Sequence, residues 1–157
     1  MIWLKQATFL TLAAAVIAAL FNLLNPGGLA IATFSPFPDL AREAHALNVP
    51  QIDLLDARQS FDEGRAVFVD ARPPELYAKG RIPGALNLPD KKFEAYFTDF
   101  HTLIPPEESV VIYCDGQDCH ASIEVAEQLK KKGYQNIRIF TGGWEQWTDS
   151  AFPVEWD

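Results

Sequence analysis

The sequence predicts an α/β domain built on a parallel sheet of about four or five strands, and three short apolar runs support this prediction. They are residues 66–69 (AVFV), 110–113 (VVIY) and 137–140 (IRIF). Strands buried on both faces read as continuous apolar runs. Segments with helical spacing of apolar residues separate these runs, as in a sheet whose connections are helices. We therefore expect one layered domain with helices on both faces of the sheet.

The other predicted elements are shorter or carry weaker signals. They are a helix over 39–47, a strand over 52–55, a helix over 57–63, an extended piece over 86–88, and helices over 91–100 and 121–132. The last helix is the clearest, because its inward face is apolar and Gly133 follows it as a terminator. That inward face consists of Ile123, Val125, Ala126 and Leu129.

Composition narrows the class of protein. The chain has 157 residues, of which 48% are hydrophobic, which is enough for one packed core. Its formal net charge is −8, and the part after residue 30 holds all the acidic residues and all but one of the basic residues. Nucleic acid needs basic neutralisation, so we expect no nucleic-acid partner. The same acidity disfavours direct docking of the domain on anionic lipid.

Residues 7–24 form an uncharged, mostly apolar stretch of 18 residues. As a helix it would span about 27 Å, close to the hydrocarbon thickness of a bilayer. Residues 25–28 (NPGG) would end that helix. We therefore expect a membrane anchor over 1–28, a linker with a short helix over 29–49, and the main domain over 50–157.

Two alternatives to the anchor remain open. Residues 30–32 (AIA) fit a cleavage pattern, so the segment could be a removed signal peptide, and it could also be a buried helix of the domain. Lys5 precedes the segment and Asp39 follows it. This order of charges predicts a single-pass membrane protein whose soluble domain faces the periplasm or the cell exterior.

Cys114 is the candidate nucleophile, because it directly follows the strand over 110–113 and precedes a helix. Sites in open α/β sheets form at the carboxyl ends of strands. The positive end of the following helix dipole would stabilise a thiolate or a persulfide anion there. Gly116 would let the backbone turn tightly around a bound anion. The alternative is a buried structural cysteine at a strand end.

Three motifs in order resemble the rhodanese family. They are residues 69–89 (VDARPPELYAKGRIPGALNLP), 111–114 (VIYC), and 142–147 (GGWEQW) with 152–154 (FPV). The resemblance covers roughly residues 50–155. It implies a three-layer α/β domain with a central, mainly parallel five-stranded sheet. It also implies sulfur transfer through a persulfide on Cys114, with no cofactor.

The resemblance also implies structural roles for the signature residues. Asp70 and Arg72 would fix loops through charge-assisted hydrogen bonds. Gly84, Gly142 and Gly143 would serve backbone geometry, and the tryptophans of the last motif, Trp144 and Trp147, would pack in the core. Arg81 stands where many members of the family carry histidine.

The loop over 114–122 (CDGQDCHAS) departs from the family pattern. Many members have a shorter loop that contains arginine, whereas this loop, which includes Asp115, Gly116, Gln117 and Asp118, has neither Arg nor Lys. Its two carboxylates would repel an anionic donor such as thiosulfate. A phosphatase loop of the Cys-x5-Arg type would need arginine at position 120, where His120 stands.

Three roles are open for Cys119. It could attack a persulfide or sulfenate on Cys114, it could form a static disulfide with Cys114, or it could point into the core at the start of the helix. His120 could favour the thiolate of Cys114 or be a polar loop residue. The spacing of Cys114, Cys119 and His120 lacks the paired pattern of structural zinc sites, so we expect no metal.

Three functions follow from these observations. The first is a membrane-tethered sulfurtransferase that carries sulfur on Cys114 between a small donor and a thiol acceptor. The second is a thiol-disulfide relay that uses Cys114 and Cys119. The third is a non-catalytic module of the same fold that binds a partner protein in the membrane. Fold by itself does not choose among them.

Overall fold

The structure is a computed structural model that describes residues 44–116 and 119–156. The predicted anchor over 1–28 and most of the linker lie outside the described residues. No helix within the described residues is long and apolar enough to cross a membrane.

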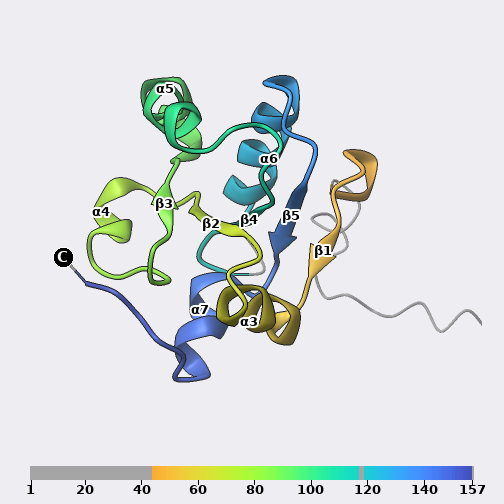
Figure 1. The fold of residues 1–157 in the computed structure, drawn as a ribbon. Coiled ribbons are helices and arrows are strands. Elements are labelled where there is room, and N and C mark those ends of the chain that lie inside the picture. The colour runs from red at the N-terminus through yellow and green to blue at the C-terminus, as the bar shows by residue number, and fades with distance from the viewer. Residues whose placement is uncertain (1–43, 117–118, 157) are drawn as a thin grey trace, which may run out of the picture. The chain divides into compact units, whose positions relative to one another are not determined.

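Five parallel strands form the sheet in the order β1-β5-β4-β2-β3 (Figure 1). The strands are β1 (Gln51–Ile52), β2 (Val67–Asp70), β3 (Leu86–Asn87), β4 (Val110–Tyr113) and β5 (Ile137–Phe140). The predicted five-stranded α/β sheet is confirmed, and every strand pair in it is parallel. Strand β4 is central, because its neighbours are β5 and β2.

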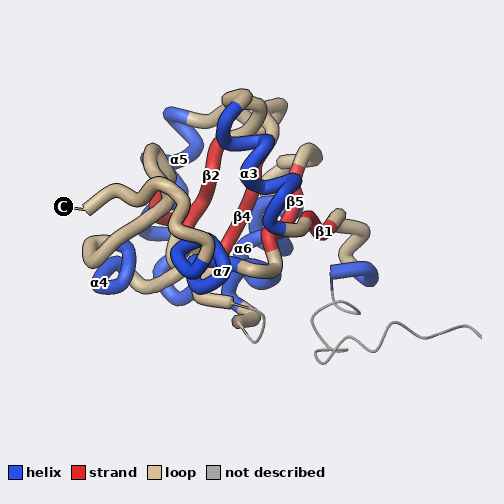
Figure 2. The backbone as a smooth tube through the Cα atoms, turned by 90° about the horizontal axis from the view of Figure 1, so that it is seen from below, coloured by secondary structure: helices blue, strands red, loops and turns tan. Residues whose placement is uncertain are grey.

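Helices cover both faces of the sheet, as Figures 1 and 2 show. Residues 44–46 are helical, and the helices after β1 are α3 (Leu54–Asp62), α4 (Pro74–Tyr77), α5 (Phe93–Leu103), α6 (Ala121–Lys131) and α7 (Gly143–Asp149). A short 3-10 turn, η1 (Asp90–Lys92), leads into α5. Helices α5 and α6 share one apolar cluster with the sheet, while α3 and α7 share the other. The three-layer arrangement follows from these two clusters.

Strand β4 divides its side chains between the two clusters. Val110 and Ile112 belong to the cluster under α5 and α6, whereas Val111 and Tyr113 belong to the cluster under α3 and α7. Successive residues of a strand point to opposite faces, so Cys114, one step beyond the strand, continues the first set. The sulfur of Cys114 therefore lies on the α6 side of the sheet, and the residue as a whole is 2% exposed.

Helix α6 matches its prediction closely, and all four residues of the predicted inward face are buried. The strand predicted over 52–55 is wrong beyond Ile52, because Leu54 opens α3. The side chain of Asp53 accepts a hydrogen bond from the Asp56 amide at 2.9 Å and so caps this helix. Helices α4 and α7 were not predicted. Both are short, and each starts in a motif that resembles a turn, with proline or glycine.

Candidate functional site

Cys114 lies at the carboxyl end of the central strand, directly before the loop that leads to α6. It forms a disulfide with Cys119, and the Cα atoms of the two residues are 6.2 Å apart. Of the three roles open for Cys119, the structure therefore shows it bonded to Cys114. Both cysteines of the chain are engaged in this bond.

Oxygen atoms surround the Cys114 sulfur. The carbonyl oxygen of Cys119 lies 3.1 Å from Sγ, and that of Gly116 lies 4.0 Å away. The hydroxyl oxygen of Ser122, on the buried face of α6, lies 3.6 Å from Sγ. A hydroxyl can turn its hydrogen toward a thiolate, so Ser122 can donate a hydrogen bond to reduced Cys114.

Ser122 was missed in the sequence, although a signal for it exists. It lies three and four positions before Val125 and Ala126 on the predicted inward face of the helix. Residues at this spacing share one face of a helix. A polar residue on a buried face near the candidate nucleophile could have been marked on that ground.

Helix α7 holds the first part of the loop through its own backbone. The amides of Trp144 and Glu145 donate hydrogen bonds to the carbonyl oxygens of Cys114 and Asp115, at 2.7 and 2.8 Å. Gly143 makes this approach possible. Its φ is +59°, and a Cβ at this position would collide with the Cys114 carbonyl oxygen. Gly143 of the last motif thus allows α7 to pack against the loop of Cys114.

A buried ion pair lies behind the loop. Arg72 Nη2 lies 2.6 Å from Asp70 Oδ2, Arg72 Nε donates to Oδ1 at 2.9 Å, and the two side chains are 3% and 0% exposed. Arg72 Nη2 also donates to the Gly80 carbonyl oxygen at 2.7 Å. Burial by itself would lower the pKa of Arg72, but the hydrogen bond and charge of Asp70 raise it, so this guanidinium stays charged.

Arg72 also reaches the loop. Its guanidinium carbon lies 4.7 Å from the centre of the Trp144 ring, which is a cation–π distance. Its Nη1 lies 3.6 Å from Asp115 Oδ1, and the side chain of Asp115 is 56% exposed. Trp144 is only partly buried and lies at the edge of the core, whereas Trp147 is fully buried within it. The arginine thus connects the first signature motif to both the loop and the last motif.

Tyr113 completes the buried polar group. Its hydroxyl accepts a hydrogen bond from the Ile82 amide at 3.2 Å. Burial raises the pKa of Tyr113, and the nearby negative charge of Asp70 raises it further. The Asn87 side-chain amide donates to the carbonyl oxygens of Asp70 and Arg72, both at 2.9 Å. These bonds fix the backbone at the carboxyl end of β2, next to β4.

The last residues of the chain pack beside this group. Arg81 and Glu155 exchange two backbone hydrogen bonds and form an ion pair through their side chains. Glu155 also accepts a hydrogen bond from the Gly84 amide at 2.9 Å. The ring of Trp156 lies edge-on to that of Trp144, with centroids 6.3 Å apart. The residue that replaces the common histidine, Arg81, therefore binds the C-terminal segment.

The remaining predicted residues lie in different places. Gln117 and Asp118 lie outside the described residues. His120 is exposed at the start of α6. Gly116 does not have a positive φ. The side chain of Glu145 packs against this glycine, and a Cβ added at position 116 would lie 2.7 Å from Glu145 Oε2. Glu145 was another residue that the sequence reasoning missed. Among the described residues, no cluster of three or more metal-ligating side chains is present.

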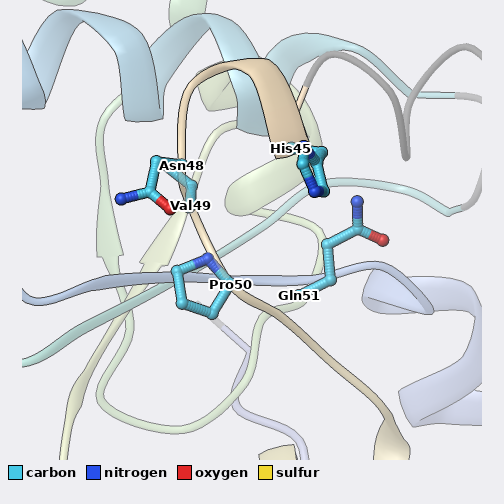
Figure 3. A pocket seen from close by; sticks show the side chains of 5 residues that line it. All are labelled: His45, Asn48, Val49, Pro50 and Gln51. Carbon is cyan, nitrogen blue, oxygen red and sulfur yellow. The ribbon is translucent and has the colours of Figure 1, made fainter.

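A pocket of about 310 Å³ lies elsewhere on the domain (Figure 3). It is lined by His45, Asn48, Val49, Pro50 and Gln51. These residues lie before or at the beginning of the edge strand β1, whereas Cys114 follows the end of β4. Strand β5 lies between β1 and β4, so the pocket is at the edge of the sheet, away from the central strand that carries Cys114.

The family follows from comparison with known proteins. Residues 53–150 match the family model described as "Rhodanese-like domain". The chain belongs to this family. The matched range includes strands β2 to β5, the Cys114 loop and α7.

Two relatives carry the name "Putative thiosulfate sulfurtransferase". The protein from Synechococcus elongatus is 28% identical over 97% of this chain, and the chain spans only about half (49%) of its length. The mitochondrial protein from Schizosaccharomyces pombe is 33% identical, and the match covers 60% of this chain and 71% of the relative.

Solved structures share the fold of this rhodanese-like domain. The human single-domain sulfurtransferase TSTD1 is 26% identical, with a TM-score of 0.56 over 64% of this chain and 96% of the human chain. A protein from Bacillus halodurans reaches a TM-score of 0.62 at 24% identity, over 74% of this chain and 83% of its own. The second likeness shows the fold alone.

Proposed function

We propose that this rhodanese-like domain is a sulfurtransferase that carries sulfur as a persulfide on Cys114. The observation that carries the proposal is the position of Cys114, at the carboxyl end of the central strand and before the amino terminus of α6. That position favours a thiolate or a persulfide anion. Ser122, 3.6 Å from the sulfur, is placed to donate to such an anion.

The reaction has two steps with Cys114 reduced. The thiolate attacks the outer sulfur of a donor R–S–SH, the S–S bond breaks, and R–S⁻ leaves with the electron pair, so that Cys114 becomes Cys–S–SH. A thiolate acceptor then attacks that outer sulfur and regenerates the Cys114 thiolate. The Cys114–Cys119 disulfide blocks the first step, so a dithiol reductant must open it beforehand.

Intact and peptide mass spectrometry tests the proposal on the full-length chain. After reduction and removal of the reductant, a sulfane-sulfur donor should add about 32 Da to the Cys114 peptide, and the reductant should reverse the gain. Cys119→Ser should keep this adduct and Cys114→Ser should lose it. If Cys114→Ser takes up sulfur as well as the unaltered chain does, Cys114 is not the carrier.

A thiol-disulfide relay is the second candidate, favoured by the disulfide between Cys114 and Cys119. In a relay the two cysteines are oxidised to a disulfide and reduced to thiols in each cycle, so loss of either cysteine abolishes turnover. A dithiol-oxidation assay with Cys119→Ser separates the two. Lost turnover together with a missing sulfur adduct supports the relay, and a persisting adduct supports sulfur transfer.

We also propose that residues 1–28 tether the domain to a membrane with the soluble part outside the cytoplasm. The support is the uncharged run over 7–24, with Lys5 before it. Alkaline extraction of membranes tests this. A full-length chain that stays in the pellet supports the anchor, and a shortened soluble product contradicts it.

A further inference from the structure

We infer that the carboxylates of Asp115 and Glu145 beside Cys114 make this domain select sulfur donors without net negative charge, and that thiosulfate is a poor donor for it. The inference rests on the proposed persulfide chemistry and names its donor class. It starts from two carboxylates of the described structure. Asp115 follows the cysteine and is exposed, and Glu145 of α7 lies against Gly116.

These carboxylates come from different elements and flank the same three residues of backbone, 114–116. Glu145 is exposed, and the hydrogen bond from its own amide to the Asp115 carbonyl fixes its backbone there. A thiosulfate dianion that approaches Cys114 would therefore meet two negative charges. Like charges slow the association of a donor with its site.

Among the described residues, the arginine side chain that reaches the loop is already bound to other groups. Arg72 is buried, and it binds Asp70, the Gly80 carbonyl oxygen and Asp115. The amides of Trp144 and Glu145 donate to loop carbonyls, so they do not face a donor. The carbonyl oxygens of Gly116 and Cys119 add partial negative charge next to the sulfur.

A donor that suits this environment carries a positive group beside its persulfide. The persulfide of an aminothiol such as cysteamine fits, because its ammonium group keeps the net charge of the donor R–S–SH from being negative. Sulfur then moves from R–S–SH to the Cys114 thiolate, the donor S–S bond breaks, and the aminothiolate leaves and takes up a proton.

The test compares donors that differ in charge. The full-length chain with Cys119→Ser is reduced, freed of reductant, and incubated with thiosulfate, cysteamine persulfide or 3-mercaptopropionate persulfide. The rate of the 32 Da gain on Cys114 is measured at the same pH for all three donors. Each donor is used at 20 and at 500 mM salt.

We expect thiosulfate and 3-mercaptopropionate persulfide to react several-fold faster at high salt, because salt screens the repulsion. The rate with cysteamine persulfide should not increase. Glu145→Gln and Asp115→Asn should each raise the ratio of the thiosulfate rate to the cysteamine persulfide rate by about threefold at low salt. Asp149→Asn is the matched control. It removes one exposed charge from the other end of α7 and should leave this ratio unchanged.

The two possible failures are distinct. If Cys114 gains sulfur but the ratio of the two donor rates changes neither with salt nor in the two variants, the inference about charge is wrong while sulfur transfer stands. If none of the three donors adds sulfur to Cys114, the proposed function is wrong and the donor class falls with it.

Discussion

At the scale of single residues, Arg72 joins the parts of the candidate site. Its guanidinium binds Asp70 with near-bidentate geometry, donates to the Gly80 carbonyl oxygen, and lies over the Trp144 ring. Because Asp70 is fully buried, water cannot replace this partner for its carboxylate. The motif containing these two residues marked them as structural, but the contacts with Gly80 and Trp144 became visible only in the folded chain.

We predict that Arg72→Met lowers the free energy of unfolding by about 3–5 kcal/mol, because it leaves the buried Asp70 carboxylate unpaired. Urea denaturation at pH 7 measures the change. The control is Lys131→Ala, which breaks an exposed ion pair of 2.8 Å with Glu127 in α6. That variant should lose less than about 1 kcal/mol. Equal losses in the two variants would show that Asp70 does not depend on Arg72.

At the scale of elements, α7 and the Cys114 loop act as one unit. Two backbone hydrogen bonds join them, and the left-handed Gly143 permits their close approach. The residues joined by these bonds lie thirty positions apart in the sequence, so neither segment predicts the other locally. The position of the loop is therefore set by a helix that the sequence presented only as a glycine-tryptophan motif.

We predict that Gly143→Ala lowers the free energy of unfolding by roughly 3 kcal/mol or more. Gly64→Ala should lose only about 1 kcal/mol. Both glycines have φ of +59°, so both variants incur the left-handed backbone cost. Only Gly143 also has the Cys114 and Asp115 carbonyls where a Cβ would stand, whereas Gly64 has no atom within 4 Å of that point. Denaturant titration of both variants checks the difference. Equal losses would mean that the Cys114 loop moves away from the added methyl group at little cost in free energy.

At the scale of the whole domain, the C-terminal segment closes the fold beside the candidate site. Glu155 joins Arg81 and the Gly84 amide, and Trp156 reaches Trp144. The hydrogen bond from the Gly84 amide, followed by that from Arg81, lowers the pKa of Glu155. A carboxylate with a lowered pKa in the folded state stabilises the protein at neutral pH, and that stabilisation is lost as the pH falls below the usual range of Glu.

We predict that Glu155→Gln makes stability less sensitive to acid. In the unaltered chain, the urea midpoint should fall as the pH drops from about 5 toward 3, because protonation of Glu155 weakens its bonds. In Glu155→Gln, part of this fall should be absent. Glu94→Gln, which removes an exposed partner of Lys132, serves as the control. Identical pH curves for the unaltered chain and Glu155→Gln would show that Glu155 does not stabilise the C-terminal segment.

The sequence by itself determined the elements whose signals are local. The apolar runs of β2, β4 and β5 and the inward face of α6 follow from periodicity, which each segment carries within itself. The same locality placed Cys114 at a strand end before a helix. Where the local signal was ambiguous, as at Leu54, the prediction was wrong, because a short apolar run fits a strand or a helix equally well.

Only the tertiary structure decided the features that depend on distant segments. These include the strand order, the disulfide geometry of the loop, the approach of α7 to Cys114, and the placement of Ser122 and Glu145 around it. The physical reason is that such contacts arise when packing brings remote residues together, and no local period records them. The environment of Cys114 is therefore a property of the folded domain.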